Sequence, residues 1–269
     1  MSPPRPELAR LVLELGVRHR VAALSWVSVE RLERHLPEAN LGAYLQGARA
    51  VVVFGLPMLD GVVDTLLAGE PYFIRRWWKN LRWETVRPVL VNPELLLKQA
   101  VKGRVTFYNN RYHFEEHLSV LNAEINSTAY AIGRLLEDSG FRALPIDPCK
   151  RHYFPLQGFL SLNGAAVVAG MGRIGRHHQL IVPGAGTRVW LGGVLTDAPL
   201  ENGPTAELEL PCDACSLCVR ACPVARREGG TLAFSPFQCK ACSRCMAVCP
   251  AGRESLTPRE PPPGDASPP

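Results

Sequence analysis

Apolar residues recur at helical spacing in two segments of the chain. Residues 6–19 begin with Pro6, which suits a first helical turn, and place four apolar residues on one face: Leu8, Leu11, Val12 and Leu15. Residues 113–139 repeat the pattern for longer and stop at Gly140, with Phe114, Leu118, Leu121, Ile125, Ile132 and Leu136 in register. We predict a helix in each segment, the second one long.

Shorter apolar runs predict strands. Ala50–Phe54 is rich in β-branched residues and is closed by Gly55. Three further runs have strand character: Phe141–Ile146, Ala165–Ala169 and Arg188–Thr196. Gly192 and Gly193 interrupt the last of them. Helices and strands together predict an α/β (α+β) core.

The composition fits a globular protein with one large and one small domain. The chain has 269 residues, 46% of them hydrophobic, which is enough for a sizeable core. No stretch approaches the roughly 20 apolar residues of a membrane span, so we expect no membrane partner. The N-terminus has no apolar signal core, and we expect a cytoplasmic location.

Two copies of one cysteine motif fill the C-terminal part of the chain. Both have the C-x2-C-x2-C-x3-C-P spacing of bacterial two-cluster ferredoxins, in which the fourth cysteine binds the other cluster. We therefore assign one [4Fe–4S] cluster to Cys212, Cys215, Cys218 and Cys249. We assign the second cluster to Cys239, Cys242, Cys245 and Cys222. We expect each fourth cysteine to begin a helix that leads away from its own triplet.

Zinc and disulfides are the competing interpretations of these cysteines. Structural zinc favours pairs of C-x2-C over triplets followed by Cys-Pro, and disulfides mark oxidising compartments and small secreted chains. Two clusters would also lower the formal net charge of 30 − 25 = +5. Because each cluster with its four thiolates carries about −2, the balance falls to about +1. The basic composition is therefore weak evidence for a nucleic-acid partner.

These patterns divide the chain into three parts. We predict a core over 1–204, a two-cluster ferredoxin domain over 205–253 and a disordered proline-rich tail over 254–269. Within the core, residues 73–87 are basic and aromatic. They fit an amphipathic helix packed on the core, a nucleic-acid surface, or part of a roof over a cofactor.

Residues 170–175 read G-M-G-R-I-G and match the pattern G-x-G-x-x-G, with Asp197 downstream. A dinucleotide site of this type needs a helix directly after the glycines, because the helix N-terminus holds the pyrophosphate. Pro183, Gly184 and Gly186 limit such a helix to about two turns. We favour a tight glycine loop that lets the backbone approach another flat or anionic ligand.

The motifs also follow one another in a distinctive order. Residues 169–181 (AGMGRIGRHHQLI) precede 189–200 (VWLGGVLTDAPL), and the doubled cysteine motif comes next. This order resembles the epoxyqueuosine reductase family, with its A-G-L-G-W-I-G-K and L-G-x-x-L-T-D segments. Ala48–Val53 resembles the family's first strand. Tyr112-His113, which we place at the opening of the long helix, resembles its Tyr-His pair.

The resemblance implies a cobalamin-dependent oxidoreductase. The family has a nitroreductase-like core, shared with reductive dehalogenases, that holds cobalamin base-off against a ferredoxin domain. The clusters would then supply electrons for a low-potential reduction similar to epoxyqueuosine reduction. The resemblance places cofactor contacts at Gly170, Gly172, Ile174, Gly175, Arg176, His177 and Thr196.

The resemblance also assigns a proton donor, the carboxyl group of Asp147. It lies in Pro145-Ile146-Asp147-Pro148-Cys149, the segment most like the family's acid motif. The same residue is equally explained as a turn aspartate before Pro148. Cys149 can face the corrin ring or be a buried small side chain.

Departures from the family pattern bear on the substrate. Arg173 replaces the family's Trp, and Arg176 replaces its Lys. Family members continue after the cysteines into a helical-repeat extension that helps to hold tRNA, whereas this sequence ends in a proline-rich tail. tRNA is therefore a doubtful partner, and the partner we expect is an electron donor: a flavodoxin, a ferredoxin or a reductase.

Two other functions fit the same residues. One is an electron carrier or cobalamin-reactivating protein with no substrate of its own. The other is a nicotinamide-dependent cluster oxidoreductase that binds its nucleotide at 170–175. One of His177 and His178 can hydrogen-bond a cofactor, or both can be surface or core histidines. Tyr112 and His113 can line a pocket or simply belong to the long helix.

Overall fold

The structure is a computed structural model, and it describes most of the core and part of the cysteine region. The described residues are 5–67, 93–146, 160–206, 212, 215–222, 226–228, 231–233 and 242–251. Several of the predictions fall outside them: Asp147, Cys149, Cys239, the segment 73–87 and the tail 254–269.

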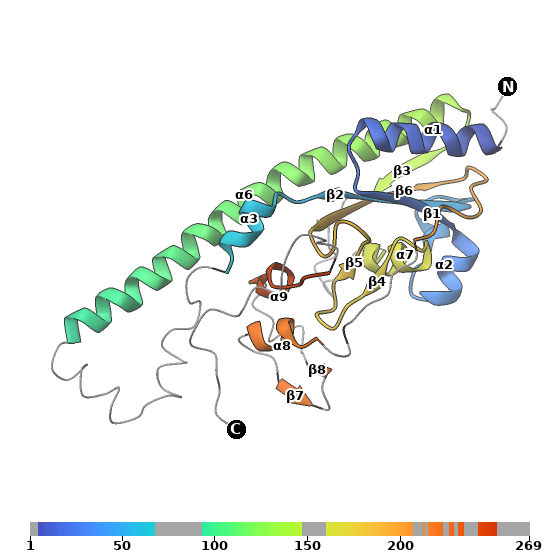
Figure 1. The fold of residues 1–269 in the computed structure, drawn as a ribbon. Helices are drawn as coiled ribbons and strands as arrows, with labels where there is room; N and C mark the ends of the chain where they lie inside the picture. Colours follow the sequence, from blue (N-terminus) through green and yellow to red (C-terminus); the bar gives the residue numbers. More distant parts are fainter. Residues whose placement is uncertain are drawn as a thin grey trace.

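A four-stranded antiparallel sheet lies at the centre of the protein (Figure 1). Its strands follow the order β1 (Ala23–Ser28), β2 (Ala50–Pro57), β6 (Val189–Thr196) and β3 (Ala143–Ile146). The strands predicted near residues 50, 143 and 190 are confirmed, and β2 continues through Gly55 to Pro57. The fold is a mixed α+β fold.

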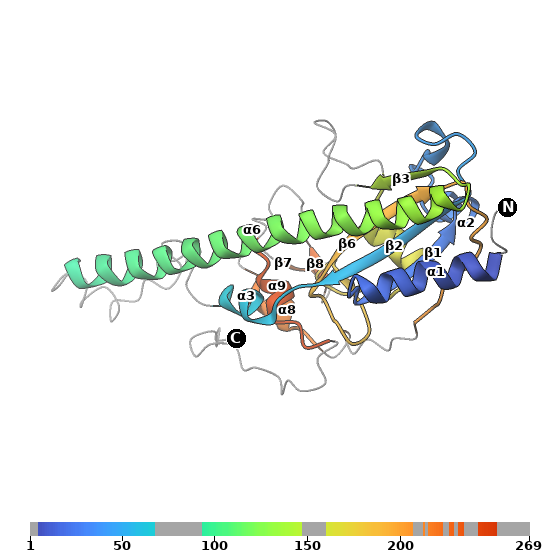
Figure 2. The same cartoon turned by 90° about the horizontal axis from the view of Figure 1, so that it is seen from above.

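Helices cover both faces of this sheet (Figures 1 and 2). On one face lie α1 (Arg5–Arg18) and the long α6 (Pro93–Asp138). On the other lie α2 (Val29–His35) and α7 (Leu162–Val168). Strand β2 explains this arrangement, because alternate residues point to opposite faces. All of its residues from 50 to 55 are fully buried or nearly so, which a sheet covered on one face alone would not allow.

Gly192 and Gly193 lie within β6 and do not interrupt it. Gly192 pairs with Phe54 on β2. A Cβ at residue 192 would lie 2.5 Å from Cγ2 of Ile125 on α6 and 2.7 Å from the Phe54 ring. The glycine therefore lets α6 and a large aromatic side chain occupy the same place on the sheet.

Two of the predicted elements need correction. Helix α6 begins at Pro93, so Tyr112 and His113 lie inside it and not at its opening. The strand predicted at Ala165–Ala169 is wrong, because these residues belong to helix α7 and its C-terminal cap. Ser161 caps the start of α7, where its hydroxyl accepts a hydrogen bond from the backbone N–H of Gly164 at 3.2 Å.

The remaining elements are short. They are the 3-10 helix η1 (Leu41–Ala43), α3 (Asp60–Thr65), the β4–β5 hairpin (Arg173–Ile174 and Leu180–Ile181), α8 (Leu217–Ala221), the β7–β8 hairpin (Arg226–Glu228 and Thr231–Ala233) and α9 (Arg244–Ala247). Among the described helices, none has a segment of the length and apolarity that crossing a bilayer demands.

Candidate functional site

Each cysteine motif contributes one short helix. Helix α8 carries Cys218, and α9 carries Cys245. The backbone N–H of Cys222 donates to the carbonyl of Val219 at 3.4 Å, and that of Cys249 donates to Met246 at 3.2 Å. The prediction that the fourth cysteine begins a helix is therefore wrong, since each one follows the helix of its own motif.

The two cysteine helices pack against each other. Cys218 and Val219 of α8 form a small apolar cluster with Cys222, Cys245 and Val248. The second half of one motif thus meets the second half of the other. A fourth cysteine in this position is close to the triplet of the opposite motif, as the crossed ligand assignment requires.

Electrostatic coupling among the thiols follows the same pattern. The pKa of Cys249 is raised to about 11, chiefly by burial and in smaller part by Cys218, Cys212 and Cys215. These three are the triplet of the first motif. Since Cys249 belongs to the second motif, its coupling to this triplet is the one that the crossed assignment predicts.

Cys245 behaves in a similar way. Its pKa is raised to about 12, chiefly by burial and in smaller part by Cys242, Cys222 and Cys218. Cys242 and Cys222 are the predicted fellow ligands, whereas Cys218 belongs to the other set. Because Cys239 lies outside the described residues, the full ligand assignment stays a prediction.

The cysteines in the described part of the chain are all free thiols: Cys212, Cys215, Cys218, Cys222, Cys242, Cys245 and Cys249. The raised pKa values of Cys245 and Cys249 keep them protonated at neutral pH, so iron binding must release their protons. Across those same described residues, no three His, Cys, Asp or Glu side chains are close enough to hold one metal ion. A four-iron cluster needs a wider spacing, because each thiolate binds a different iron.

The glycine motif forms a hairpin and does not start a helix. Arg173 pairs with Ile181, and Ile174 pairs with Leu180, so β4 turns directly back into β5. Helix α7 precedes the glycines, where a dinucleotide fold would have a strand. The strand–glycine–helix arrangement of a pyrophosphate site is therefore not present in this described segment.

Internal packing accounts for the three glycines. Gly170 has a positive φ of 77°. A Cβ at Gly172 would clash with the backbone carbonyl oxygen of Ile181 in the partner strand. A Cβ at Gly175 would lie 2.8 Å from Cε1 of His177. The motif can thus be explained by the hairpin alone, and a ligand at these glycines stays a prediction.

His177 is the hairpin residue with an unpaired buried group. Its side chain is only 5% exposed, and Nδ1 accepts a hydrogen bond from the backbone N–H of Gln179 at 3.1 Å. Burial, together with the nearby His178, lowers the pKa of His177 to about 4. The ring is therefore neutral at pH 7 with its proton on Nε2, and this buried atom has no hydrogen-bond partner among the described residues.

The other predicted cofactor contacts differ in exposure. Ile174 is exposed at the edge of the hairpin, and Arg176 is half-buried. Thr196 is fully buried, and its hydroxyl donates to the carbonyl of Arg142 at 2.8 Å. Its donor is therefore already used within the protein, and its role as a cofactor contact stays a prediction.

Asp197 also has a partner within the core. Its carboxylate accepts hydrogen bonds from the backbone N–H of Arg142 at 2.7 Å and from Arg142 Nε at 2.8 Å. A dinucleotide site would need this carboxylate for a ribose. The ion pair with Arg142 gives Asp197 a different role in this structure.

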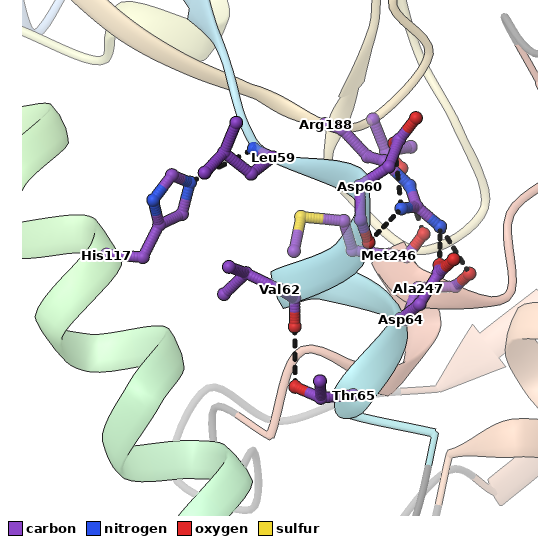
Figure 3. A network of polar contacts seen from close by, with 10 residues as sticks. Leu59, Asp60, Val62, Asp64, Thr65, His117, Arg188, Met246 and Ala247 are labelled. Atoms are coloured by element: carbon purple, nitrogen blue, oxygen red, sulfur yellow. Dashed lines mark hydrogen bonds and ion pairs between the residues drawn. The ribbon is translucent and has the colours of Figure 1, made fainter.

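Sequence reasoning missed the junction that joins α9 to the core (Figure 3). Arg188, just before β6, lies between Asp60 and Asp64 of α3 and the carbonyl of Ala247 in α9. A cavity of about 380 Å³ beside it is lined in part by Met58, Asp60 and Arg188. The available signal was a pair of aspartates four residues apart, which share one helical face.

Comparison with known proteins shows a similarity of fold. Neither family models nor curated protein sequences gave a match. A catabolic reductive dehalogenase in complex with 3-bromo-4-hydroxybenzoic acid has a TM-score of 0.53 at 17% identity, over 91% of this chain and 32% of that one. This likeness shows a shared fold and nothing about the reaction.

Two further solved structures have TM-scores below 0.5. Epoxyqueuosine reductase from Streptococcus thermophilus has a TM-score of 0.44 at 17% identity, over 83% of this chain and 54% of that one. A reductive dehalogenase described for B12-dependent dehalogenation has a TM-score of 0.45 at 16% identity, over 79% of this chain and 24% of that one. The chain thus spans about half the length of the epoxyqueuosine reductase and a third or less of the dehalogenases.

Proposed function

We propose that this protein is an iron–sulfur oxidoreductase in which two [4Fe–4S] clusters deliver electrons to a cobalamin held by the α+β core. The observation that carries the proposal is the contact between the two cysteine helices. Cys218 and Cys222 of one motif pack with Cys245 of the other. This contact suits a pair of clusters that exchange their fourth ligands.

The cysteine set fits iron–sulfur clusters better than it fits disulfides. The described thiols are free, and those of Cys245 and Cys249 are buried enough to be neutral until a metal displaces their protons. Cluster assembly would supply the positive charge that four neighbouring thiolates need, since the irons offset the repulsion among them.

One described group of the core, the Nε2–H of His177, has no acceptor among the described residues and could meet one on a ligand. A buried donor without an acceptor is costly unless a ligand supplies one, and cobalamin carries amide and phosphate acceptors. When bound, cobalamin would supply a cobalt centre that takes up single electrons and reduces the substrate. Arg176 would provide a second donor, and Asp147 is proposed as the proton donor.

The substrate class remains that of the resemblance, an epoxide-bearing or similarly reducible compound. The electron donor is proposed to be a flavodoxin, a ferredoxin or a reductase.

An anaerobic reconstitution tests the proposal in two stages. Iron and sulfide analysis should give about eight irons per chain. Titration of cob(II)alamin into this protein should then give a stoichiometric change to the base-off visible and EPR spectra. Eight irons without that change would refute the cobalamin part and leave an electron-transfer protein. No iron would refute the whole proposal.

Paired cysteine variants test the crossed ligand assignment. Cys215→Ala with Cys249→Ala removes two ligands from one predicted cluster, so about four irons should remain. Cys215→Ala with Cys222→Ala damages both predicted clusters and should leave close to none. The reverse result would show that each motif binds its own cluster.

A further inference from the structure

Arg188 is a buried cation at the point where three elements of the fold meet (Figure 3). Its side chain is 4% exposed, and it forms ion pairs with Asp60 at 2.9 Å and Asp64 at 2.6 Å. Both carboxylates belong to α3, and Asp64 is itself only 24% exposed. A buried guanidinium needs such partners, because removing its charge from water costs several kcal/mol.

The same guanidinium reaches the second cysteine motif. Arg188 Nη2 donates a hydrogen bond to the backbone carbonyl of Ala247 at 3.2 Å. Ala247 lies in α9, two residues after Cys245 and two before Cys249. By the crossed assignment these two cysteines bind different clusters, so the contact lies beside both.

Neighbouring hydrogen bonds hold α9 in the same place. The hydroxyl of Thr187 donates to the carbonyl of Met246 at 3.1 Å. In the opposite direction, Arg244 Nη2 at the start of α9 donates to the carbonyl of Leu67, just after α3, at 3.0 Å. Met246 and Ala247 are buried within the main hydrophobic core. The helix between the two cysteines is thus fixed to the core by side-chain donors and by packing.

At this junction the Arg188 guanidinium faces two carboxylates, next to a site that would carry about −2 for each oxidised cluster. A cluster gains a further negative charge when it is reduced. Arg188 therefore favours the reduced cluster, while Asp60 and Asp64 oppose it, because like charges in a buried site repel strongly.

We propose that Arg188 is a positioning residue that fixes the cluster-bearing helix α9 against the core and raises the reduction potential of the clusters beside α9 by offsetting Asp60 and Asp64. This inference rests on the proposed function, since it requires that the cysteines hold clusters. It adds a role for three residues outside the cysteine motifs and the glycine hairpin.

Opposite charge changes separate the electrostatic role from a structural one. Arg188→Met removes the positive charge that faces Asp60 and Asp64 and should lower the potential of the clusters beside α9 in an EPR-monitored redox titration of the reconstituted protein. Asp64→Asn keeps the size of the side chain but removes one negative charge, so it should raise the potential. A purely structural contact would make both variants change in the same direction. Arg134→Met and Asp138→Asn alter a similar ion pair of 2.7 Å on the exposed face of α6 and should leave the potential unchanged.

Hydrogen exchange provides a readout that does not depend on the clusters. Arg188→Met should speed amide exchange at residues 244–248 at least tenfold relative to Arg134→Met. If the Arg188→Met protein loses its iron, the reduction potentials of the Asp64→Asn and Arg188→Lys proteins still test the electrostatic role. Lysine keeps the positive charge of arginine but not its planar fork of donors. Potentials that move in the same direction, or not at all, would overturn the electrostatic role. Unchanged exchange would overturn the positioning role, whereas a wild-type protein without iron would refute the proposed function instead.

Discussion

The unusual state of His177 predicts a specific pH dependence of stability. The folded protein holds the pKa of this ring at about 4, chiefly through burial, whereas an unfolded histidine has a value of 6.5. The pKa is lowered, so the unfolded chain binds a proton more readily than the folded one. The contribution of the neutral His177 ring to the free energy of unfolding is therefore fully present above pH 6.5. It is lost as the pH falls from 6.5 towards 4.

The size of the effect follows from the two pKa values. Between pH 7.5 and pH 5.5 the contribution of His177 to the free energy of unfolding should fall by about 1.4 kcal/mol, the equivalent of a tenfold change in the folding equilibrium. Replacing His177 with Gln removes the titrating group. The stability difference between wild type and His177→Gln should therefore change by about this amount over the same range.

Urea unfolding followed by tryptophan fluorescence measures this difference at pH 7.5, 6.5 and 5.5. Other groups titrate alike in both proteins and cancel in the subtraction. His35→Gln serves as the control, because His35 is exposed at the end of α2. If the His177→Gln protein loses as much stability as the wild type between pH 7.5 and 5.5, then the ring is not held neutral and its Nε2–H is not the donor that the proposed function uses.

Two further substitutions test the packing of the core. Gly172→Ala should destabilise the protein by several kcal/mol, because the new methyl group meets the carbonyl oxygen of Ile181. The control is Gly61→Ala in α3, where the new methyl group points into open space. This control should be neutral or stabilising by up to about 1 kcal/mol. Ser25→Ala should cost about 1–3 kcal/mol in urea unfolding, since the buried hydroxyl lies 2.8 Å from the carbonyl oxygens of Ala169 and Pro204 and donates its one proton between them. A neutral Gly172→Ala or Ser25→Ala variant would contradict the packing described here.

The central sheet and α6 were predictable because their signals are local and periodic. The β-branched run at β2 and the apolar repeat from Phe114 to Leu136 are sufficient to identify a buried strand and an amphipathic helix. The start of α6 could not be predicted in this way, since the apolar periodicity identified only its C-terminal part. Tyr112 and His113 consequently looked like a helix start although they lie inside the helix.

Helix α7 shows why a short apolar run is ambiguous. Residues 165–169 are small or β-branched and have no helical periodicity of their own. The outcome depends on the Ser161 cap and on burial of Ala165 and Ala166 against the sheet, and the second of these is a tertiary contact. A window of five residues contains neither signal, so strand and helix were equally compatible with it.

The cysteine motifs give a local signal in the sequence, whereas the Arg188 junction does not. Ligand spacing is encoded within a dozen residues, so the identity of the candidate cluster site could be predicted. Arg188 is 124 residues away from Asp64 and 59 from Ala247, so no spacing rule connects them. Only the fold brings the three together.

The short connection between β5 and β6 joins the two halves of the candidate site. Residues 182–188 begin where the His177 hairpin ends and finish at Arg188, which holds α9. The connection is stiffened by paired backbone hydrogen bonds between Val182 and Gly186 at 2.9 and 2.7 Å. A ligand bound at His177 and a cluster bound beside α9 would therefore be held by adjacent parts of one rigid segment. Electron transfer between two such groups would depend steeply on their separation, and this connection would help to set that separation.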